Sequence, residues 1–265
     1  MNYHFAVITG ATSGIGAAFA GVLPAETNLL LTGRSEQKLA AAKASLSRPG
    51  RQVETVVADL ATDGGRQRMV DAMAALPVDL LVNNAGFGHL GPSMCNDPAV
   101  EREMIEINVT AAVVLTRAVL PAMLKLSAST GRRCGVIAVS SLAAFQPMPY
   151  LATYGAAKSF VLSYFEALAC ELEGLPVSVV ALCPGRTDTG FFERAGISRT
   201  KLRSLVPAER VAREGLDALG RKTVHVVGAY NRLRSLLVRH APRSLATRLA
   251  ARALRRYLDQ GSGRN

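Results

Sequence analysis

The sequence is poor in aromatic side chains and contains no tryptophan: Phe, Trp and Tyr together make up 5% of its 265 residues. Few aromatics leave little material for the stacking platforms on which single-stranded nucleic acids bind. The chain is nevertheless 49% hydrophobic. This composition favours an interior packed by alanine, valine and leucine, and the length is usual for one large α/β domain.

Cysteine and histidine are scarce, and neither residue type gathers into a site. The four cysteines form no CxxC pair and no other metal-ligand spacing: Cys95, Cys134, Cys170 and Cys183. The four histidines are equally scattered: His4, His89, His225 and His240. Metal centres need clustered ligands, so the sequence predicts no metal ion. Thiols without such a pattern are typical of a reducing compartment, and we expect a cytoplasmic protein.

Long hydrophobic runs and flexible linkers are also missing. No uninterrupted apolar stretch approaches the roughly 20 residues that cross a bilayer. The opening segment MNYHFAVITG has no basic leader before its apolar run, so we do not expect a signal peptide. No Gly/Ser-rich block divides the chain. These features predict one folded domain over residues 1–228, followed by an extension over residues 229–265.

Acidic residues are nearly absent from the end of the chain. The net charge is +11, and residues 221–265 hold 11 lysines and arginines against a single acid, Asp259. The rest of the chain is close to neutral, so the charge says little about the main domain. Nucleic acid is not a predicted partner, because no recognised binding module accompanies the charge.

Within the extension, the segment PRSLATRLAARALRRYL predicts a basic amphipathic helix, and the preceding AYNRLRSLLVRHA is similar in character. On a helical wheel, apolar side chains gather on one side and arginines on another. The two sets are Leu245, Leu249, Ala253 and Tyr257, and Arg248, Arg252 and Arg255. Such a helix can lie peripherally on an anionic membrane. It can equally pack against the domain or a second subunit, and the sequence leaves both hypotheses open.

The abundant feature of the sequence is the alternation of short apolar segments with helical ones. Seven strand candidates occupy residues 4–9, 28–33, 52–58, 79–84, 134–140, 177–183 and 223–228. Amphipathic or alanine-rich segments lie near residues 15–23, 36–47, 62–76, 98–127, 153–173 and 207–220. This alternation is typical of βαβ units. It predicts an α/β fold of the Rossmann type, a doubly wound, seven-stranded parallel sheet with helices on both faces.

The first strand runs into a glycine-rich turn, TGATSGIG at residues 9–16, and a helix pattern follows. Glycines let the backbone approach a ligand closely, and the start of a helix attracts a pyrophosphate. A plain strand-to-helix turn is the alternative, which the position at the start of a βαβ series disfavours. The predicted dinucleotide contacts are Gly10, Ser13, Gly14, Ile15 and Gly16.

The second strand ends in LLLTGRS, where a dinucleotide site selects its cofactor. An acid there would bind a ribose 2′-hydroxyl, but this sequence has Arg34. A guanidinium attracts a 2′-phosphate, so the sequence favours NADP(H), with NAD(H) as the second choice. Arg34 could instead stack on adenine or lie in solvent. Asp59, beside Leu60 after the third strand, is expected to accept a hydrogen bond from the adenine amino group.

The stretch LATYGAAKSF places Tyr154 and Lys158 four residues apart, one above the other on a helix. A free phenol has a pKa near ~10. A fixed cation nearby favours the phenolate and makes the phenol a usable proton donor and acceptor near neutral pH. The pair indicates acid–base chemistry, provided that the rest of the chain supplies a reaction that needs it.

Six motifs occur in the order seen in short-chain dehydrogenases/reductases. They are TGATSGIG, NNAG at 83–86, IN at 107–108, VSS at 139–141, YGAAK at 154–158 and PG at 184–185. The chain resembles the compact, single-domain branch of that family over residues 4–228. The resemblance implies an oxidoreductase that interconverts a carbonyl and an alcohol with a nicotinamide cofactor. It also implies a homodimer or homotetramer, built through the helices near residues 98–127 and 153–173.

The same motifs give a catalytic set. Tyr154 would transfer the proton, Lys158 would lower its pKa and bond the nicotinamide ribose, and Ser141 would hold the substrate oxygen. Ser140 is the neighbouring alternative, but the interval to Tyr154 favours Ser141. Asn108 would kink its long helix and hold a water that relays protons to Lys158.

Two further motifs complete the implied cofactor site. NNAG would line the adenine ribose through Asn84, Ala85 and Gly86, with Asn84 closest to the cofactor. The segment CPGRTDT would contact the nicotinamide carboxamide through Thr187 and Thr189. Pro184 and Gly185 begin that segment, and Gly185 would keep space for the ring.

The predicted substrate pocket is apolar. Its expected walls are Phe87, His89, residues 142–148, Phe191 and Phe192. The two last phenylalanines belong to residues 186–206, a candidate loop or lid. No cationic cluster for a substrate phosphate or carboxylate is recognised, although Arg186 stands near, and we expect an apolar carbonyl or alcohol substrate. Two other functions stay open: a non-catalytic dinucleotide sensor, and a membrane-surface protein acting through its basic tail.

Overall fold

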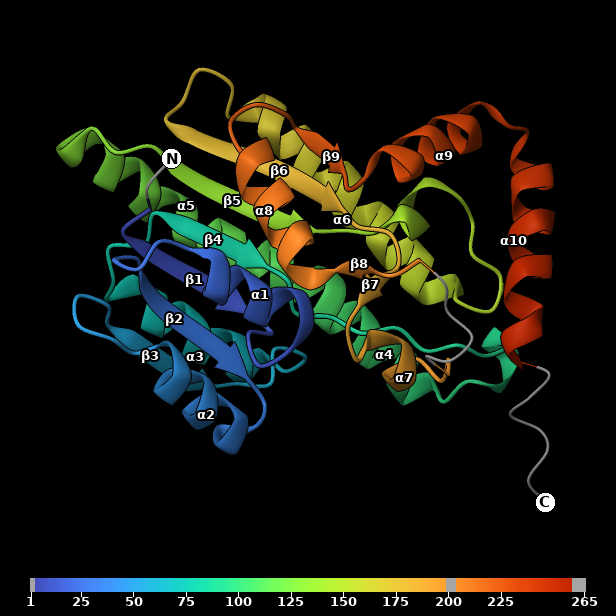
Figure 1. Ribbon diagram of the computed structural model, residues 1–265, viewed down its shortest axis with the longest axis horizontal. Helices are drawn as coiled ribbons and strands as arrows, with labels where there is room; N and C mark the ends of the chain where they lie inside the picture. Colours follow the sequence, from blue (N-terminus) through green and yellow to red (C-terminus); the bar gives the residue numbers. More distant parts are fainter. Residues whose placement is uncertain (1–2, 199–203, 259–265) are drawn as a thin grey trace.

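The computed structural model describes residues 3–198 and 204–258. Seven strands form one sheet in the order β3-β2-β1-β4-β5-β6-β9 (Figure 1), and all neighbours are parallel. They are β1 (Phe5–Thr9), β2 (Asn28–Gly33), β3 (Val53–Val57), β4 (Leu80–Asn83), β5 (Cys134–Val139), β6 (Val177–Cys183) and β9 (Val224–Val226). The seven predicted strands and the Rossmann-type sheet are confirmed.

Helices cover both faces of this sheet. They are α1 (Gly14–Val22), α2 (Glu36–Leu46) and α8 (Ala208–Ala218) on one face, and α3 (Asp63–Ala74), α5 (Ala111–Thr130) and α6 (Ala152–Glu171) on the other. Side chains alternate between the faces along each strand. Leu29 and Leu31 pack in the hydrophobic core under α1, α2 and α8. Leu30 packs in the core on the opposite face, under α3, α5 and α6, and all three leucines are buried. This double burial is why the strands read as continuous apolar runs.

The strand order reverses between β1 and β4, which pair in the centre of the sheet. The helix after β1 packs on one face, and the long helix after β4 packs on the other. Such a reversal opens a crevice at the carboxyl ends of the two strands. The glycine-rich turn follows β1 and NNAG follows β4, so the topology itself brings two predicted cofactor motifs to one edge.

A long helical stretch runs through α4 (Pro98–Ile105), the π-helical segment η2 (Glu106–Thr110) and α5. Residues Pro98–Thr130 are long and apolar enough to cross a membrane by composition, but 44% of the tested window is buried inside the protein. Leu115, Val119 and Met123 of α5 lie in the hydrophobic core. The stretch is therefore accounted for as a core helix of the domain.

The described residues of the segment 186–206 hold three short elements instead of a plain loop. They are β7 (Thr187–Asp188), α7 (Phe191–Arg194) and β8 (Val206–Pro207), and β7 pairs with β8 in a small parallel sheet. Residues 199–203 of this predicted lid lie outside the described residues.

After β9 the chain continues into α9 (Ala229–His240) and α10 (Arg243–Leu258). Both helices lie at one side of the molecule, in red in Figure 1. α9 packs against η3 (Leu142–Phe145), the turn that follows β5. The basic extension therefore lies beside the segment that leads to Tyr154, and the division of the chain at residue 228 stays a prediction.

Candidate active site

The glycine-rich turn between β1 and α1 has a backbone that suits glycine. Gly10 and Gly14 have positive φ angles of 62° and 57°, which glycine adopts without strain. A Cβ atom on Gly16 would clash with the carbonyl oxygen of Gly10. Ser13 is the N-cap of α1, and Ile15 lines the adjoining cavity. The turn therefore offers bare backbone and a helix start to a ligand.

The NNAG segment after β4 holds this turn in place. The Nδ2 group of Asn84 donates hydrogen bonds to the carbonyl oxygens of Thr9 at 2.9 Å and Gly10 at 3.2 Å. The backbone N–H groups of Asn84 and Ala85 both donate to the Thr9 hydroxyl at 2.9 Å. Asn84, Ala85 and Gly86 all line the cavity. The structure thus brings together the predicted sets from the first and fourth strands.

Arg34, after β2, lines the same cavity. Its side chain is 56% exposed, and its Nη1 atom lies 2.8 Å from Glu103 Oε1. Of the two residues predicted near adenine, Leu60 lines the cavity, whereas Asp59 is not among the lining residues. Asp59 Oδ1 instead accepts a hydrogen bond from the N–H of Ala61 at 3.1 Å. The carboxylate of Asp59 therefore stabilises the turn after β3.

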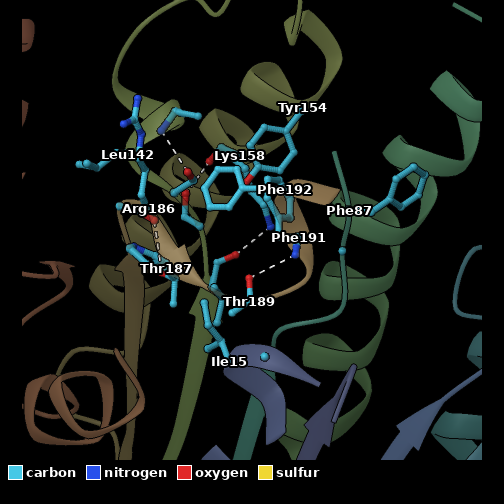
Figure 2. A pocket seen from close by; sticks show the side chains of 18 of the residues that line it. Ile15, Phe87, Leu142, Tyr154, Lys158, Arg186, Thr187, Thr189, Phe191 and Phe192 are labelled. Carbon is cyan, nitrogen blue, oxygen red and sulfur yellow. Dashed lines mark hydrogen bonds between the residues drawn. The ribbon is translucent and has the colours of Figure 1, made fainter. Parts of the chain in front are cut away.

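Ser141, Tyr154 and Lys158 meet at the cavity, from the end of β5 and the first turns of α6. Ser141 is hydrogen-bonded to Tyr154 and also accepts from the N–H of Ala143 at 3.1 Å. Lys158 Nζ lies 5.8 Å from the centre of the Tyr154 ring and donates to the carbonyl oxygen of Val139 at 2.9 Å. Tyr154 and Lys158 are both buried and lie next to each other in Figure 2.

Ser140 has a different role from its neighbour. Its hydroxyl is buried and donates to the carbonyl oxygen of Lys158 at 2.8 Å. This bond holds α6 against the end of β5 and thereby fixes the height of Lys158. Because the Ser140 hydroxyl is engaged in this way and the Ser141 hydroxyl contacts Tyr154, the geometry favours Ser141 as the substrate-facing serine.

Burial dominates the ionisation of the Tyr154–Lys158 pair. Burial raises the pKa of Tyr154 to about 12, although the hydrogen bond with Ser141 acts in the opposite direction. Burial also lowers the pKa of Lys158 to about 8, because an ammonium loses its hydration there. Desolvation of the phenolate therefore sets the direction of the Tyr154 pKa shift in this arrangement, and the effect of Lys158 on this pKa stays a prediction.

The long helix opens into its π-helical segment at Asn108. Single π-helical turns of this kind are frequent at functional sites. Asn108 Nδ2 donates to the carbonyl oxygens of Phe87 and Met104, both at 2.9 Å. Its Oδ1 atom is buried and has no hydrogen-bond partner within residues 3–198 and 204–258. Gly86 lies next to both Asn108 and Lys158: if it carried a Cβ atom, that atom would clash with Asn108 Oδ1 and lie 3.4 Å from Lys158 Nζ. The buried acceptor Asn108 Oδ1 is therefore near the buried amine of Lys158.

The segment after β6 closes the cavity from the opposite side. Its four predicted contact residues all line the cavity: Pro184, Gly185, Thr187 and Thr189. Thr189 packs closely against the glycine-rich turn: a Cβ atom added to Gly14 would lie only 2.9 Å from the methyl carbon of Thr189. The hydroxyl of Thr189 accepts from the N–H of Phe191 at 3.3 Å, a bond drawn in Figure 2.

These motifs line one cavity of about 1020 Å³. Single ligand pockets commonly span ~300–1,000 Å³, so the cavity is large enough for more than a small substrate. The predicted walls Phe87, Leu142, Phe191 and Phe192 line it. His89 does not line it, so the prediction for His89 is wrong. Its imidazole instead lies near Gly91, in the loop that follows NNAG.

Sequence reasoning missed a whole wall of this cavity. α9 and α10 contribute lining residues that include Tyr230, Val238, Leu254 and Tyr257. Arginines from several segments also line the cavity, whereas the sequence pointed only to Arg186. The only available signal was the basic, leucine-rich composition of the tail, which does not reveal what the tail packs against.

Comparison with known proteins agrees with this geometry. Residues 4–199 match the family model described as short chain dehydrogenase. The chain belongs to the short-chain dehydrogenase family. It is therefore an oxidoreductase. Members of this family oxidise CH–OH groups, or reduce the corresponding carbonyls, with NAD or NADP as the cofactor.

Two curated relatives illustrate the range of this short-chain dehydrogenase family. Sulfoacetaldehyde reductase 2 of Chromohalobacter salexigens is 36% identical over 190 residues, which cover 70% of this chain and 73% of the relative. Dehydrogenase/reductase SDR family member 7B of Bos taurus is 34% identical over 244 residues, which cover 83% of this chain and 72% of the relative.

Solved short-chain dehydrogenases have the same fold. One from Sphingobium yanoikuyae, solved with NADPH, superposes with a TM-score of 0.79 at 28% identity and covers 88% of this chain and 91% of its own. One from Burkholderia phymatum, solved with NAD, gives a TM-score of 0.76 at 25% identity over 89% and 92% of the two chains.

Proposed function

We propose that this protein is an NADP(H)-dependent oxidoreductase that interconverts a carbonyl and an alcohol on a largely apolar substrate. The observation that carries the proposal is the meeting of Ser141, Tyr154 and Lys158 at one end of the cavity that the glycine-rich turn borders. A relative solved with NADPH and one solved with NAD support a nicotinamide dinucleotide as the cofactor.

The residues of the cavity fit such a dinucleotide. Gly10, Gly14 and Gly16 form a cradle that a Cβ atom would fill, and the start of α1 faces it. When bound there, the dinucleotide supplies a hydride to, or removes one from, the carbon that carries the substrate oxygen. Arg34 and Asn84 would hold it, together with four residues after β6: Pro184, Gly185, Thr187 and Thr189.

The side chains of the chain itself handle the substrate oxygen and its proton. Ser141 orients the oxygen by a hydrogen bond, and Tyr154 gives the proton during reduction or takes it during oxidation. Lys158 lies one turn away, and Asn108 Oδ1 offers it a nearby buried acceptor. The raised pKa of Tyr154 keeps the phenol protonated at neutral pH, which suits the direction of carbonyl reduction.

We predict that Arg34→Ala will weaken NADPH binding roughly 10–100-fold, because a charged hydrogen bond to a phosphate is worth ~1.5–3 kcal/mol. NADH lacks the 2′-phosphate, so its dissociation constant should change little. Fluorescence titration of both cofactors measures the two constants. Glu103→Gln is the matched control: it removes the carboxylate partner of Arg34 and keeps the guanidinium, so the preference for NADPH should persist. Equal losses for both cofactors would refute the role of Arg34.

The outer surface of α9 and α10 favours a second function, peripheral contact with a membrane. Five large apolar side chains of these helices are 50–65% exposed and lie outside the cavity lining: Leu233, Leu236, Leu237, Leu245 and Leu249. In α10, Ala246 and Ala250 are buried and Leu254 packs against the domain. Leu245 and Leu249 are therefore left exposed. Exposed leucines among arginines suit an anionic bilayer interface.

We predict that anionic vesicles will retain the protein and that Leu233→Glu with Leu237→Glu will release it. Co-sedimentation with phosphatidylserine-containing vesicles measures the bound fraction, and phosphatidylcholine vesicles show the contribution of charge. Leu175→Glu is the matched control, because Leu175 is 43% exposed but lies before β6, outside the extension. Equal binding by all three proteins, or none by the parent, would discard the membrane hypothesis.

Assembly and location stay predictions. The outer face of α6 presents Phe160, 44% exposed and stacked on Tyr164 with ring centres 5.8 Å apart. An exposed aromatic pair on this helix supports the expected contact between copies in a homodimer or homotetramer. A cytoplasmic location rests on the composition of the sequence alone.

A further inference from the structure

The residues that line the cavity carry charge of one sign. Its lining includes Lys158 and six arginines: Arg34, Arg186, Arg194, Arg210, Arg234 and Arg256. Among the described residues, no aspartate or glutamate lines it. The chain as a whole contains 20 acidic residues, so the cavity differs from the rest of the molecule. A concave surface of one sign concentrates ligands of the opposite sign.

Three of these arginines are accounted for by other roles. Arg34 lies after β2, where a 2′-phosphate would bind. Arg210 is paired with Glu214 on the same helix at 2.9 Å. The Arg194 Nε group donates to the carbonyl oxygen of Gly190, within its own short helix. Arg34 and Arg210 therefore have a predicted ligand or a carboxylate partner, and Arg194 belongs to α7, outside the segments that carry the other three.

Arg186, Arg234 and Arg256 remain. They come from the segment after β6, from α9 and from α10, and all three line the cavity, as do Tyr230 and Leu254. Within the described part of the chain, none of the three has a carboxylate in ion-pair distance. These three arginines form a basic part of the cavity lining, to which the tail contributes Arg234 and Arg256.

Neutral groups orient two of these side chains. Arg186 Nη2 lies 3.5 Å from the hydroxyl of Tyr257. The Arg256 guanidinium lies 5.3 Å from the centre of the Tyr257 ring, and its Nε donates to the carbonyl oxygen of Ala253. Each guanidinium has five N–H donors in a fork that matches an oxyanion. Most of these donors therefore stay available around Tyr257.

We infer that Arg186, Arg234 and Arg256 form a subsite for an oxyanion on the substrate. The substrate class is then an apolar carbonyl or alcohol compound that carries an acidic group, a carboxylate or a phosphate ester, at a distance from the reacting carbon. The inference rests on the proposed function, because the apolar walls and Tyr154 must accept the rest of the same molecule. The inference narrows the proposed substrate class from apolar compounds in general to amphiphiles that carry a negative charge.

The test compares matched substrates in the intact protein with NADPH. A panel of apolar ketones is assayed as free acids, as phosphate esters and as uncharged methyl esters or alcohols of the same carbon skeleton. We expect kcat/KM to be about 10–100-fold higher for one anionic series, since a charged hydrogen bond is worth ~1.5–3 kcal/mol. The series with the higher kcat/KM shows whether the subsite binds a carboxylate or a phosphate.

Two variants assign that preference to the subsite. Arg234→Gln and Arg256→Gln should each remove most of the gain through KM, without changing kcat/KM for the uncharged ketones or the dissociation constant for NADPH. Arg252→Gln is the matched control: Arg252 lies one turn before Arg256 in α10 but is not among the cavity-lining residues, so this variant should keep the preference. Melting temperatures of all variants check that they are folded.

The outcomes separate the two proposals. Turnover of uncharged ketones with no gain for either acid overturns the subsite and leaves the proposed function standing. A gain that survives in both variants also overturns it, as does a loss of NADPH affinity in either variant, which would assign the arginines to the cofactor. No turnover of any ketone or alcohol with either cofactor contradicts the proposed function itself.

Discussion

Replacing Tyr154 by phenylalanine is expected to lower kcat by about 10²–10⁴, the usual contribution of a positioned general acid. The phenol hydroxyl is the group that contacts Ser141 at the cavity, and phenylalanine keeps the ring that packs against Phe191 with centres 5.2 Å apart. Binding of NADPH should therefore change little. Steady-state assays with a panel of ketones measure kcat, and fluorescence titration measures the cofactor dissociation constant.

Tyr164→Phe is the matched control for this prediction. Tyr164 lies further along α6 and is not among the cavity-lining residues, so loss of its hydroxyl should leave kcat unchanged. A non-catalytic dinucleotide sensor would behave differently, because the parent would bind NADPH without turning over any ketone. Equal kcat values in the parent and Tyr154→Phe would remove Tyr154 from the mechanism.

Replacing Gly16 by alanine is expected to abolish tight dinucleotide binding. The new Cβ atom would clash with the carbonyl oxygen of Gly10 and lie 2.6 Å from Asn84 Nδ2. Either the glycine-rich turn or Asn84 must then move, and overpacking of this kind costs about 1–3 kcal/mol. Because the displaced groups form the cradle, we expect the dissociation constant for NADPH to rise roughly 10–100-fold.

Gly21→Ala separates this clash from a general effect of alanine. Gly21 lies in the same helix, α1, and a Cβ atom there meets nothing within 4 Å. Alanine should stabilise the helix by roughly 0.5–1 kcal/mol and leave NADPH binding intact. Thermal melts and cofactor titrations of both variants make the comparison. Unchanged binding in Gly16→Ala would show that the turn does not approach the cofactor closely.

Much of the fold and of the site follows from local sequence patterns. Apolar strands covered on both faces have continuous hydrophobic sequences, so their positions are readable. Parallel strands end at one edge, which brings Gly10 after β1 and Ser141 after β5 to the same cavity. The expected kink at Asn108 corresponds to η2, where the helix adds a π-helical turn. These features depend on spacing and topology, which a sequence records.

Other features depend on contacts between distant segments and could not be predicted. The pairing of Arg34 with Glu103 joins the end of β2 to α4, and no local pattern announces it. The placement of α9 and α10 against the cavity brings Arg234 into the same cavity lining as Arg186. The upward shift of the Tyr154 pKa depends on burial of its side chain, which the four-residue spacing from Lys158 does not reveal. Each case turns on packing rather than on spacing.

The most direct test of carbonyl reduction through Tyr154 follows deuterium into the product from NADPH in which both C4 hydrogens of the nicotinamide are deuterium. Parent protein and Tyr154→Phe are incubated with the same ketone panel, and the alcohols are analysed by mass spectrometry. We expect deuterium on the carbinol carbon with the parent and formation slower by about 10² or more with the variant. Alcohol formed without deuterium, or at equal rates by both proteins, would contradict the assignment.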